Sequence, residues 1–244
     1  MPQERRNLRI IEIATGLMLI LSVLTMLVSV LLGFDYTLPN ATFSEDIDFL
    51  KDSISRQQVS AIAWLVAAGV NLVFLPVYLL MFHRFQIGMH ILNSFFILAM
   101  AFFFFMLGIK ELYIADITAK LIGSDPEVGD ALTTEILLSI RQVQLSLKLG
   151  LTAFGAFATI FTISRFSEVR FPVFGSTLTF LAAPVVITFT WLNPDHLLMT
   201  SSLAVAWTGL LIIGARFVTL GLKEKILPGA TPATPKSPDQ YGKK

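Results

Sequence analysis

Hydrophobic residues along the chain gather into six long runs separated by polar segments. The runs cover residues 13–33, 59–82, 89–109, 149–164, 171–192 and 197–215, and none of them contains Asp, Glu, Lys or Arg. A helix needs about 20 apolar residues to cross the hydrocarbon core of a bilayer. Backbone polar groups in lipid must be satisfied within the segment, which favours helices over open strands. The pattern therefore predicts an all-α fold, a polytopic membrane bundle with six transmembrane helices.

Helices two to four are predicted to extend beyond the membrane on one side. Apolar residues recur at helical spacing through residues 44–58 and 110–148, which flank the second, third and fourth runs. The only break within 110–148 is the sequence Gly-Ser-Asp-Pro at 123–126, so we expect one helix to end near Ile122 and the next to begin near Glu127. We call residues 44–58 and 110–148 the annex.

The annex is expected to hold together through apolar stripes that need burial away from water. These stripes are Ile47/Leu50/Ile54, Leu112/Ala115/Ala119 and Val128/Leu132/Ile136/Ile140. Acidic residues on the outer faces make the annex the expected contact surface for an extracytoplasmic protein partner. Residues 228–244, in contrast, are rich in Pro and Gly and are predicted to be a disordered tail.

Composition agrees with a lipid environment and removes several classes of function. Hydrophobic residues make up 55% of the 244, charged residues 14%, and the mean hydropathy is +0.73, whereas soluble domains carry about 25% charged residues. A net charge of +1 gives no field for nucleic acid binding. The absence of cysteine excludes disulfides, thiolate catalysis and iron–sulfur clusters.

The distribution of charge predicts the orientation. Residues 1–12, 83–88, 165–170 and 216–244 hold 12 of the 18 Lys and Arg but 5 of the 17 acids, and the remaining loops hold 6 basic and 12 acidic residues. Cytoplasmic loops carry the excess of Lys and Arg. We therefore expect a multi-pass protein of the cytoplasmic (plasma or inner) membrane with its N-terminus and C-terminus in the cytoplasm.

No pattern in the chain predicts a catalytic, cofactor or metal site. His83 and His90 are placed near the cytoplasmic face and His196 near the outer face, so we interpret all three as interfacial residues without a ligand role. The chain carries no HExxH motif and no glycine-rich phosphate loop. We expect no haem, metal or nucleotide to be bound.

The polar positions inside the membrane are the remaining candidates for function. Asn71 lies near the middle of the second run, Asn93 lies in the third, and counting outward from the turn at 83–88 places Tyr78 at the depth of Asn93. Either Asn could line a solute path or form a hydrogen bond between helices, and we favour the structural interpretation. Tyr78 and Asn93 are expected to be close enough to bond.

Two segments resemble a known family. The acidic loop and helix SEDIDFLKDSISRQQVSAIAWLVAAGVNLVFLPVYLLMF is followed by a tight basic turn, and SRFSEVRFPVFG carries Arg170, Pro172 and Gly175 into the fifth run. This layout resembles the bacterial six-span family known as DUF4386. The resemblance implies a fold and a topology, but no reaction and no site residues.

The function that we expect is non-catalytic: a scaffold, an accessory subunit or a lipid-interacting protein, with membrane lipids as contacts. The alternative is a transporter or channel for a neutral or apolar solute. Its path would pass near Asn71, Asn93, Pro76 and Thr188. An enzyme is not expected, because the annex residues Glu135, Arg141 and Lys148 would form a site only by accident of packing.

Overall fold

The described chain is a bundle of long helices. The computed structural model describes residues 2–33, 54–80, 87–165, 172–192 and 197–223. Within them lie α1 (Pro2–Gly33), α3 (Ile54–Leu79), α4 (Ile87–Leu121), α5 (Pro126–Arg165), α6 (Val173–Leu192) and α7 (Leu197–Lys223), and no strand. All six described helices are long and apolar enough to cross a membrane. The predicted all-α bundle is confirmed, and the protein is a multi-pass membrane protein.

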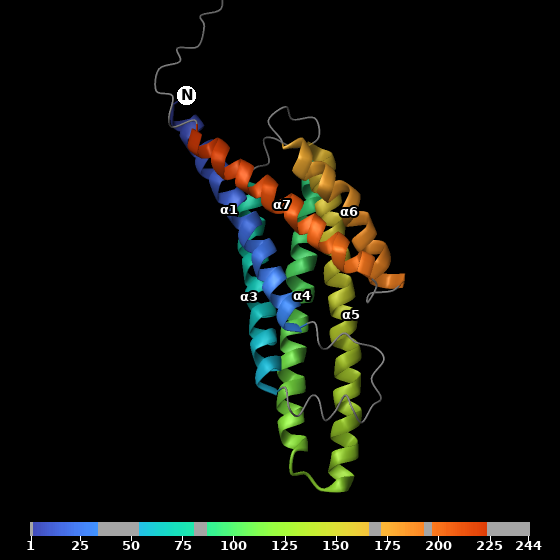
Figure 1. The fold of residues 1–244 in the computed structure, drawn as a ribbon. Coiled ribbons are helices and arrows are strands. Elements are labelled where there is room, and N and C mark those ends of the chain that lie inside the picture. The colour runs from blue at the N-terminus through green and yellow to red at the C-terminus, as the bar shows by residue number, and fades with distance from the viewer. Residues whose placement is uncertain (1, 34–53, 81–86, 166–171, 193–196, 224–244) are drawn as a thin grey trace, which may run out of the picture.

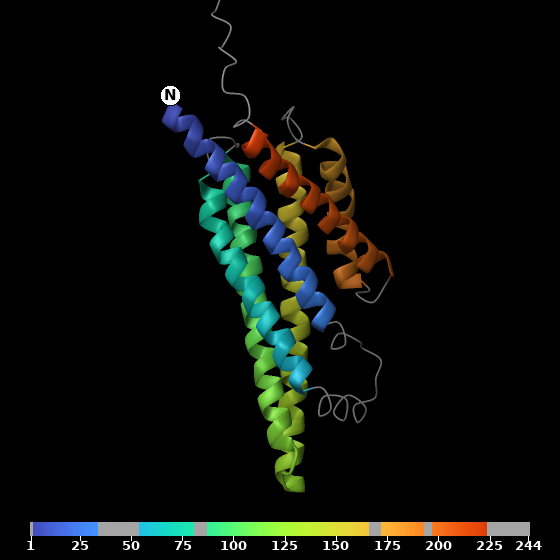
Figure 2. The same ribbon diagram turned by 60° about the vertical axis from the view of Figure 1, so that its left-hand side comes forward.

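The helices form a closed ring. Each helix packs mainly against its neighbours in sequence, and α7 returns to pack against α1. The start of α1 and the end of α7 lie at the same end of the bundle (Figure 1). Both α1 and α7 lie oblique to α3, α4 and α5 (Figures 1 and 2). The ring is filled by large side chains that are almost fully buried, including Trp64, Phe74, Phe104, Phe154 and Phe157.

Glycines allow α1, α6 and α7 to approach one another closely. A Cβ atom at Gly209 of α7 would lie 2.6 Å from the carbonyl oxygen of Gly175 in α6. A Cβ atom at Gly16 of α1 would likewise lie 2.6 Å from the carbonyl oxygen of Gly214 in α7. Small residues at such crossings permit backbone-to-backbone packing in membranes, where apolar burial does not drive association.

The helices α4 and α5 extend as a hairpin beyond the ends of α1, α6 and α7 (Figures 1 and 2). Gly123 makes the reversal with a φ of +102°, a conformation that favours glycine. Ser124 closes the turn through hydrogen bonds from its amide and its hydroxyl to the Leu121 carbonyl, at 3.3 and 3.0 Å. The helix ends at Leu121 and Pro126 confirm the predicted break.

The predicted stripe on α4 is out of phase with the buried face. Leu112 and Ala119 are exposed, whereas the inward face consists of Glu111, Ile114, Ala115, Ile117 and Thr118. The stripe on α5 is largely confirmed, because Ile136 is fully buried and Leu132 and Ile140 pack against the core, although Val128 is exposed. Of the first stripe, Ile47 and Leu50 lie outside the described residues, as does the tail at 228–244.

Candidate functional site

Tyr78 and Asn93 form a buried hydrogen bond between α3 and α4. The Asn93 Nδ2 donates to the Tyr78 hydroxyl at 2.9 Å, and neither side chain is exposed. The pairing predicted from the depth of the two residues is confirmed. Tyr78 and Asn93 are equally far in sequence from the middle of the segment 83–88 between two antiparallel helices, and such residues share depth.

His90 joins this pair. Its ring stacks on Tyr78 with the centroids 4.5 Å apart and an angle of 14° between the planes, and it is fully buried. His90 lies near the start of α4 and is buried inside the bundle, which the interpretation as an interfacial residue did not foresee, while His83 and His196 lie outside the described residues. His90 precedes Asn93 by three residues and so shares its helix face, a signal that the sequence contained.

Aromatic rings surround the Tyr78–His90–Asn93 cluster. Phe74, Phe157 and Phe161 lie with their ring centroids 5.9, 6.3 and 6.2 Å from that of Tyr78. The Asn93 Oδ1 is buried without a hydrogen-bond partner in the described part of the chain. The cluster is thus a polar link in an apolar interior, and it ties α3 to α4 beside α5.

We expect the bond between Tyr78 and Asn93 to show a coupling energy of about 0.6–1.7 kcal/mol, the range of interhelical hydrogen bonds in membranes. The measurement is a double-mutant cycle with Tyr78→Phe, Asn93→Leu and the double variant, read as unfolding free energy in detergent. Additive losses would show that the two side chains do not stabilise each other.

Asn71 joins α3 to α1. The Ser22 hydroxyl donates to Asn71 Oδ1 at 2.8 Å, and Asn71 Nδ2 donates to the Ala67 carbonyl of its own helix at 2.8 Å. Asn71 is fully buried and Ser22 is 5% exposed. Both polar ends of the amide are therefore satisfied between two helices, as the structural interpretation of Asn71 requires.

The other residues proposed for a solute path do not gather around Asn71. Pro76 and Thr188 are both exposed on the outside of the bundle. The Thr188 hydroxyl donates to the Pro184 carbonyl of its own helix at 2.9 Å. The expectation that Asn71, Asn93, Pro76 and Thr188 line one path is wrong, because helix rotation directs the last two away from the ring.

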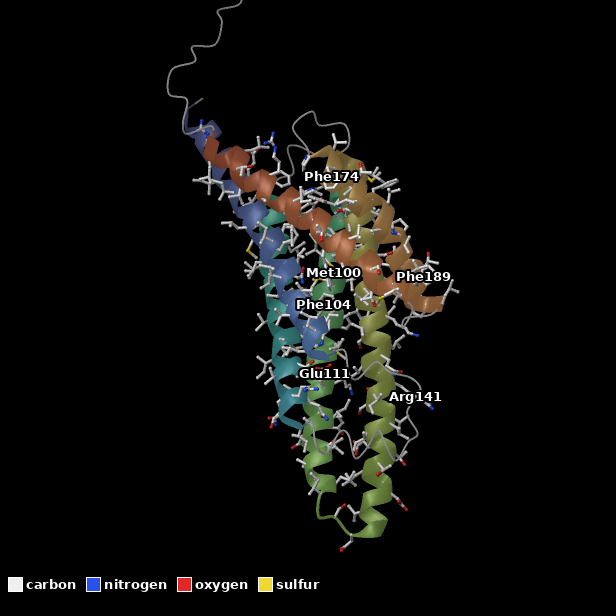
Figure 3. The ribbon with its side chains drawn as sticks, in the orientation of Figure 1. Met100, Phe104, Glu111, Arg141, Phe174 and Phe189 are labelled. Atoms are coloured by element: carbon white, nitrogen blue, oxygen red, sulfur yellow. The ribbon has the colours of Figure 1, made fainter. Side chains whose placement is uncertain are left out.

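The annex residues Glu135, Arg141 and Lys148 also do not converge. Glu135 accepts a hydrogen bond from Tyr113 of α4, whereas Lys148 lies over the Trp191 ring of α6 with its Nζ 5.9 Å from the centroid. Arg141 is exposed (Figure 3). The three side chains therefore do not form one site.

The sequence did not reveal two buried acids, Glu12 of α1, which is 8% exposed, and Glu111 of α4. Glu111 of α4 is 5% exposed and faces Ser60 of α3, which is fully buried. Figure 3 shows Glu111 close to the level at which α1 ends. The residue was overlooked because it follows the apolar run 89–109 and was assigned to a solvated annex.

The described residues contain no group of three or more His, Asp or Glu that could hold a metal ion. Comparison with protein families, with curated protein sequences and with solved structures finds no match to this chain. The resemblance to the DUF4386 family stays a prediction.

Proposed function

We propose that the protein is a non-catalytic membrane scaffold or accessory subunit. The observation that carries this proposal is the environment of Asn71, whose amide is fully buried and hydrogen-bonded to Ser22 of α1 and to its own helix. A residue that lines a solute path keeps polar groups available to the solute or to water. The Asn71 amide instead forms hydrogen bonds to Ser22 of α1 and to the Ala67 carbonyl of its own helix.

The second intramembrane amide supports the same proposal. Asn93 is bonded to Tyr78 among packed aromatic rings and is fully buried. At both intramembrane amides, the side chains stabilise helix pairs.

Contact with lipid explains why large apolar side chains are exposed on the outer surface of the helix ring. On α4 the exposed large residues Ile91, Phe95, Leu98, Phe102 and Phe105 recur every three or four positions. This spacing places them on one helix face, and side chains of this kind are stable in hydrocarbon.

The proposed location is the cytoplasmic membrane, with both termini in the cytoplasm. It is supported by the concentration of Lys and Arg in residues 1–12, 83–88, 165–170 and 216–244. In this orientation the α4–α5 hairpin is extracytoplasmic. A protein partner at the annex stays a prediction; of its acids, Asp125 and Asp130 are exposed, while Asp116 pairs with Lys120 at 2.6 Å.

A single labelling experiment tests function and orientation together, because the chain has no cysteine of its own. We expect Asn71→Cys to resist a hydrophilic thiol reagent in intact cells and in permeabilised cells. Ser124→Cys at the hairpin turn should react in intact cells, and Ser237→Cys only after permeabilisation. The readout is the fraction of each variant labelled.

The outcomes separate the alternatives. Rapid labelling of Asn71→Cys would reveal a wet path and favour the transporter or channel for a neutral solute. Labelling of Ser237→Cys in intact cells would reverse the orientation. Denatured protein, in which all three cysteines must react, provides the control for reactivity.

A further inference from the structure

Lys148 of α5 and Trp191 of α6 contact each other on the outer surface of the helix ring. The Lys148 Nζ lies over the Trp191 ring, 5.9 Å from its centroid, and the Trp191 Nε1 donates to the Thr152 hydroxyl at 2.9 Å. Thr152 in turn donates to the Lys148 carbonyl at 2.8 Å. Two residues one turn apart on α5 thus hold the indole in place. Trp191 is nevertheless 48% exposed, and Lys148 is half-buried.

This pair marks an edge of the hydrocarbon core. Lys148 directly precedes the uncharged run 149–164, and Trp191 lies at the end of the run 171–192. Tryptophan is enriched where hydrocarbon meets lipid headgroups, and a lysine near the end of a span extends its ammonium to the same level. Since α5 continues beyond the end of α6 into the hairpin (Figures 1 and 2), the pair lies in the leaflet on the hairpin side.

A second pair of the same kind lies at this end of α4. Lys110 directly follows the uncharged run of α4, and its Nζ lies 5.5 Å from the centroid of the exposed Tyr113 ring. The ring of Phe104 in α4 would lie 2.6 Å from a Cβ atom at Gly150 of α5, so these two residues share depth. Lys110 lies six residues from Phe104 toward the hairpin, and Lys148 two residues from Gly150. The two lysines therefore differ in depth by only about 6 Å at 1.5 Å per residue.

The Lys148 ammonium has no acidic partner among the described residues. It forms no ion pair with any of them, and its contact with Trp191 is a contact with a neutral ring. The described residues of α6 include no acid. The nearest acid on α5 is Glu135, which precedes Lys148 by 13 residues, or about 20 Å along the helix. The positive charge is therefore available to a group outside the chain.

We propose that Lys148 and Trp191 bind the headgroup of an anionic phospholipid in the leaflet on the hairpin side. The ammonium donates to the phosphate, and the exposed part of the indole contacts the glycerol and the upper acyl chain. A zwitterionic headgroup binds less well because it carries its own cation beside the phosphate. The inference rests on the lipid contact proposed above, but not on the scaffold role or the orientation, which the labelling of Asn71→Cys and Ser237→Cys tests separately.

The exposed tryptophan supplies the probe for the test. The chain has three tryptophans, and the other two, Trp64 and Trp207, are 2% and 6% exposed. Lipids with brominated acyl chains quench tryptophan fluorescence on contact, so quenching in vesicles reports mainly lipid at Trp191. The full-length protein is reconstituted in mixtures of phosphatidylglycerol, the anionic probe, and phosphatidylcholine, the zwitterionic one, with one of the two lipids brominated.

We expect the relative affinity at Trp191 to favour phosphatidylglycerol by about fivefold, the size expected for one lysine at a membrane surface. The preference should shrink at about 1 M salt, where the Debye length is about 3 Å. Inorganic phosphate at equal ionic strength should not displace the lipid, and displacement would assign the site to free phosphate instead. Equal quenching by the two lipids would overturn the proposal, as would the absence of quenching by either.

Matched variants assign the preference to Lys148. Lys148→Gln removes the charge and should abolish the preference, whereas Lys148→Arg keeps the charge and should retain it. Lys120→Gln, at an exposed lysine of the hairpin that pairs with Asp116, should also retain it. Trp191→Phe should lose most of the quenching, which identifies the source of the signal. An unchanged preference in Lys148→Gln would exclude this site.

Discussion

Ile136→Asp is expected to lower the free energy of unfolding by about 3–5 kcal/mol, because it removes a buried side chain and puts a charge in its place. Ile136 is fully buried on the face of α5 that belongs to the core. An aspartate there has neither water nor a basic partner. The hairpin of α4 and α5 should loosen, and limited proteolysis near residues 122–125 together with the Tm measures it.

Leu138→Asp is the matched control. Leu138 lies two residues further along α5 and is 55% exposed, so a charge there should change stability by less than about 0.5 kcal/mol if water surrounds the hairpin. Equal losses in the two variants would place this part of α5 in lipid. Wild-type protease resistance in Ile136→Asp would contradict the packing of the hairpin.

Gly209→Ala is expected to cost about 1–3 kcal/mol although it adds only one methyl group, because the crossing of α6 and α7 has no room for it. The new Cβ would lie 2.6 Å from the Gly175 carbonyl oxygen, and the Thr179 hydroxyl is closer still. Backbone cannot move aside as a flexible side chain can. The two helices must separate, and the Tm in detergent should fall.

Gly69→Ala controls for the general effect of replacing glycine in a helix. A Cβ at Gly69 of α3 meets nothing within 4 Å. Alanine favours helix over glycine by up to about 1 kcal/mol, so this variant should equal or exceed the wild type in stability. A similar loss in both variants would mean that the crossing of α6 and α7 is not especially tight.

The buried polar residues show which side-chain contacts can be predicted from a single sequence and which cannot. The bond between Tyr78 and Asn93 was predictable, because the two residues are equally far in sequence from the middle of the segment 83–88. The burial of His90 on Tyr78 was not predicted, although its spacing from Asn93 allowed it. Asn71 offered no such guide, since its partner Ser22 comes from a helix 49 residues away.

The sequence by itself determined the six apolar helices of the described residues and the place where the hairpin turns, because long uncharged runs and a Gly-Ser-Asp-Pro break act locally. It did not determine all the helix ends, since α1 begins at Pro2 and α7 ends at Lys223, outside the predicted runs. Only the tertiary structure decided which face of each helix is buried. In lipid both faces of a helix are apolar, so periodicity does not reveal the inward one. In the annex part of α4 the predicted stripe was wrong because the buried face includes the polar residues Glu111 and Thr118, while the apolar Leu112 and Ala119 are exposed. The same physics hid Glu111, whose burial follows from the rotation of α4 against α3.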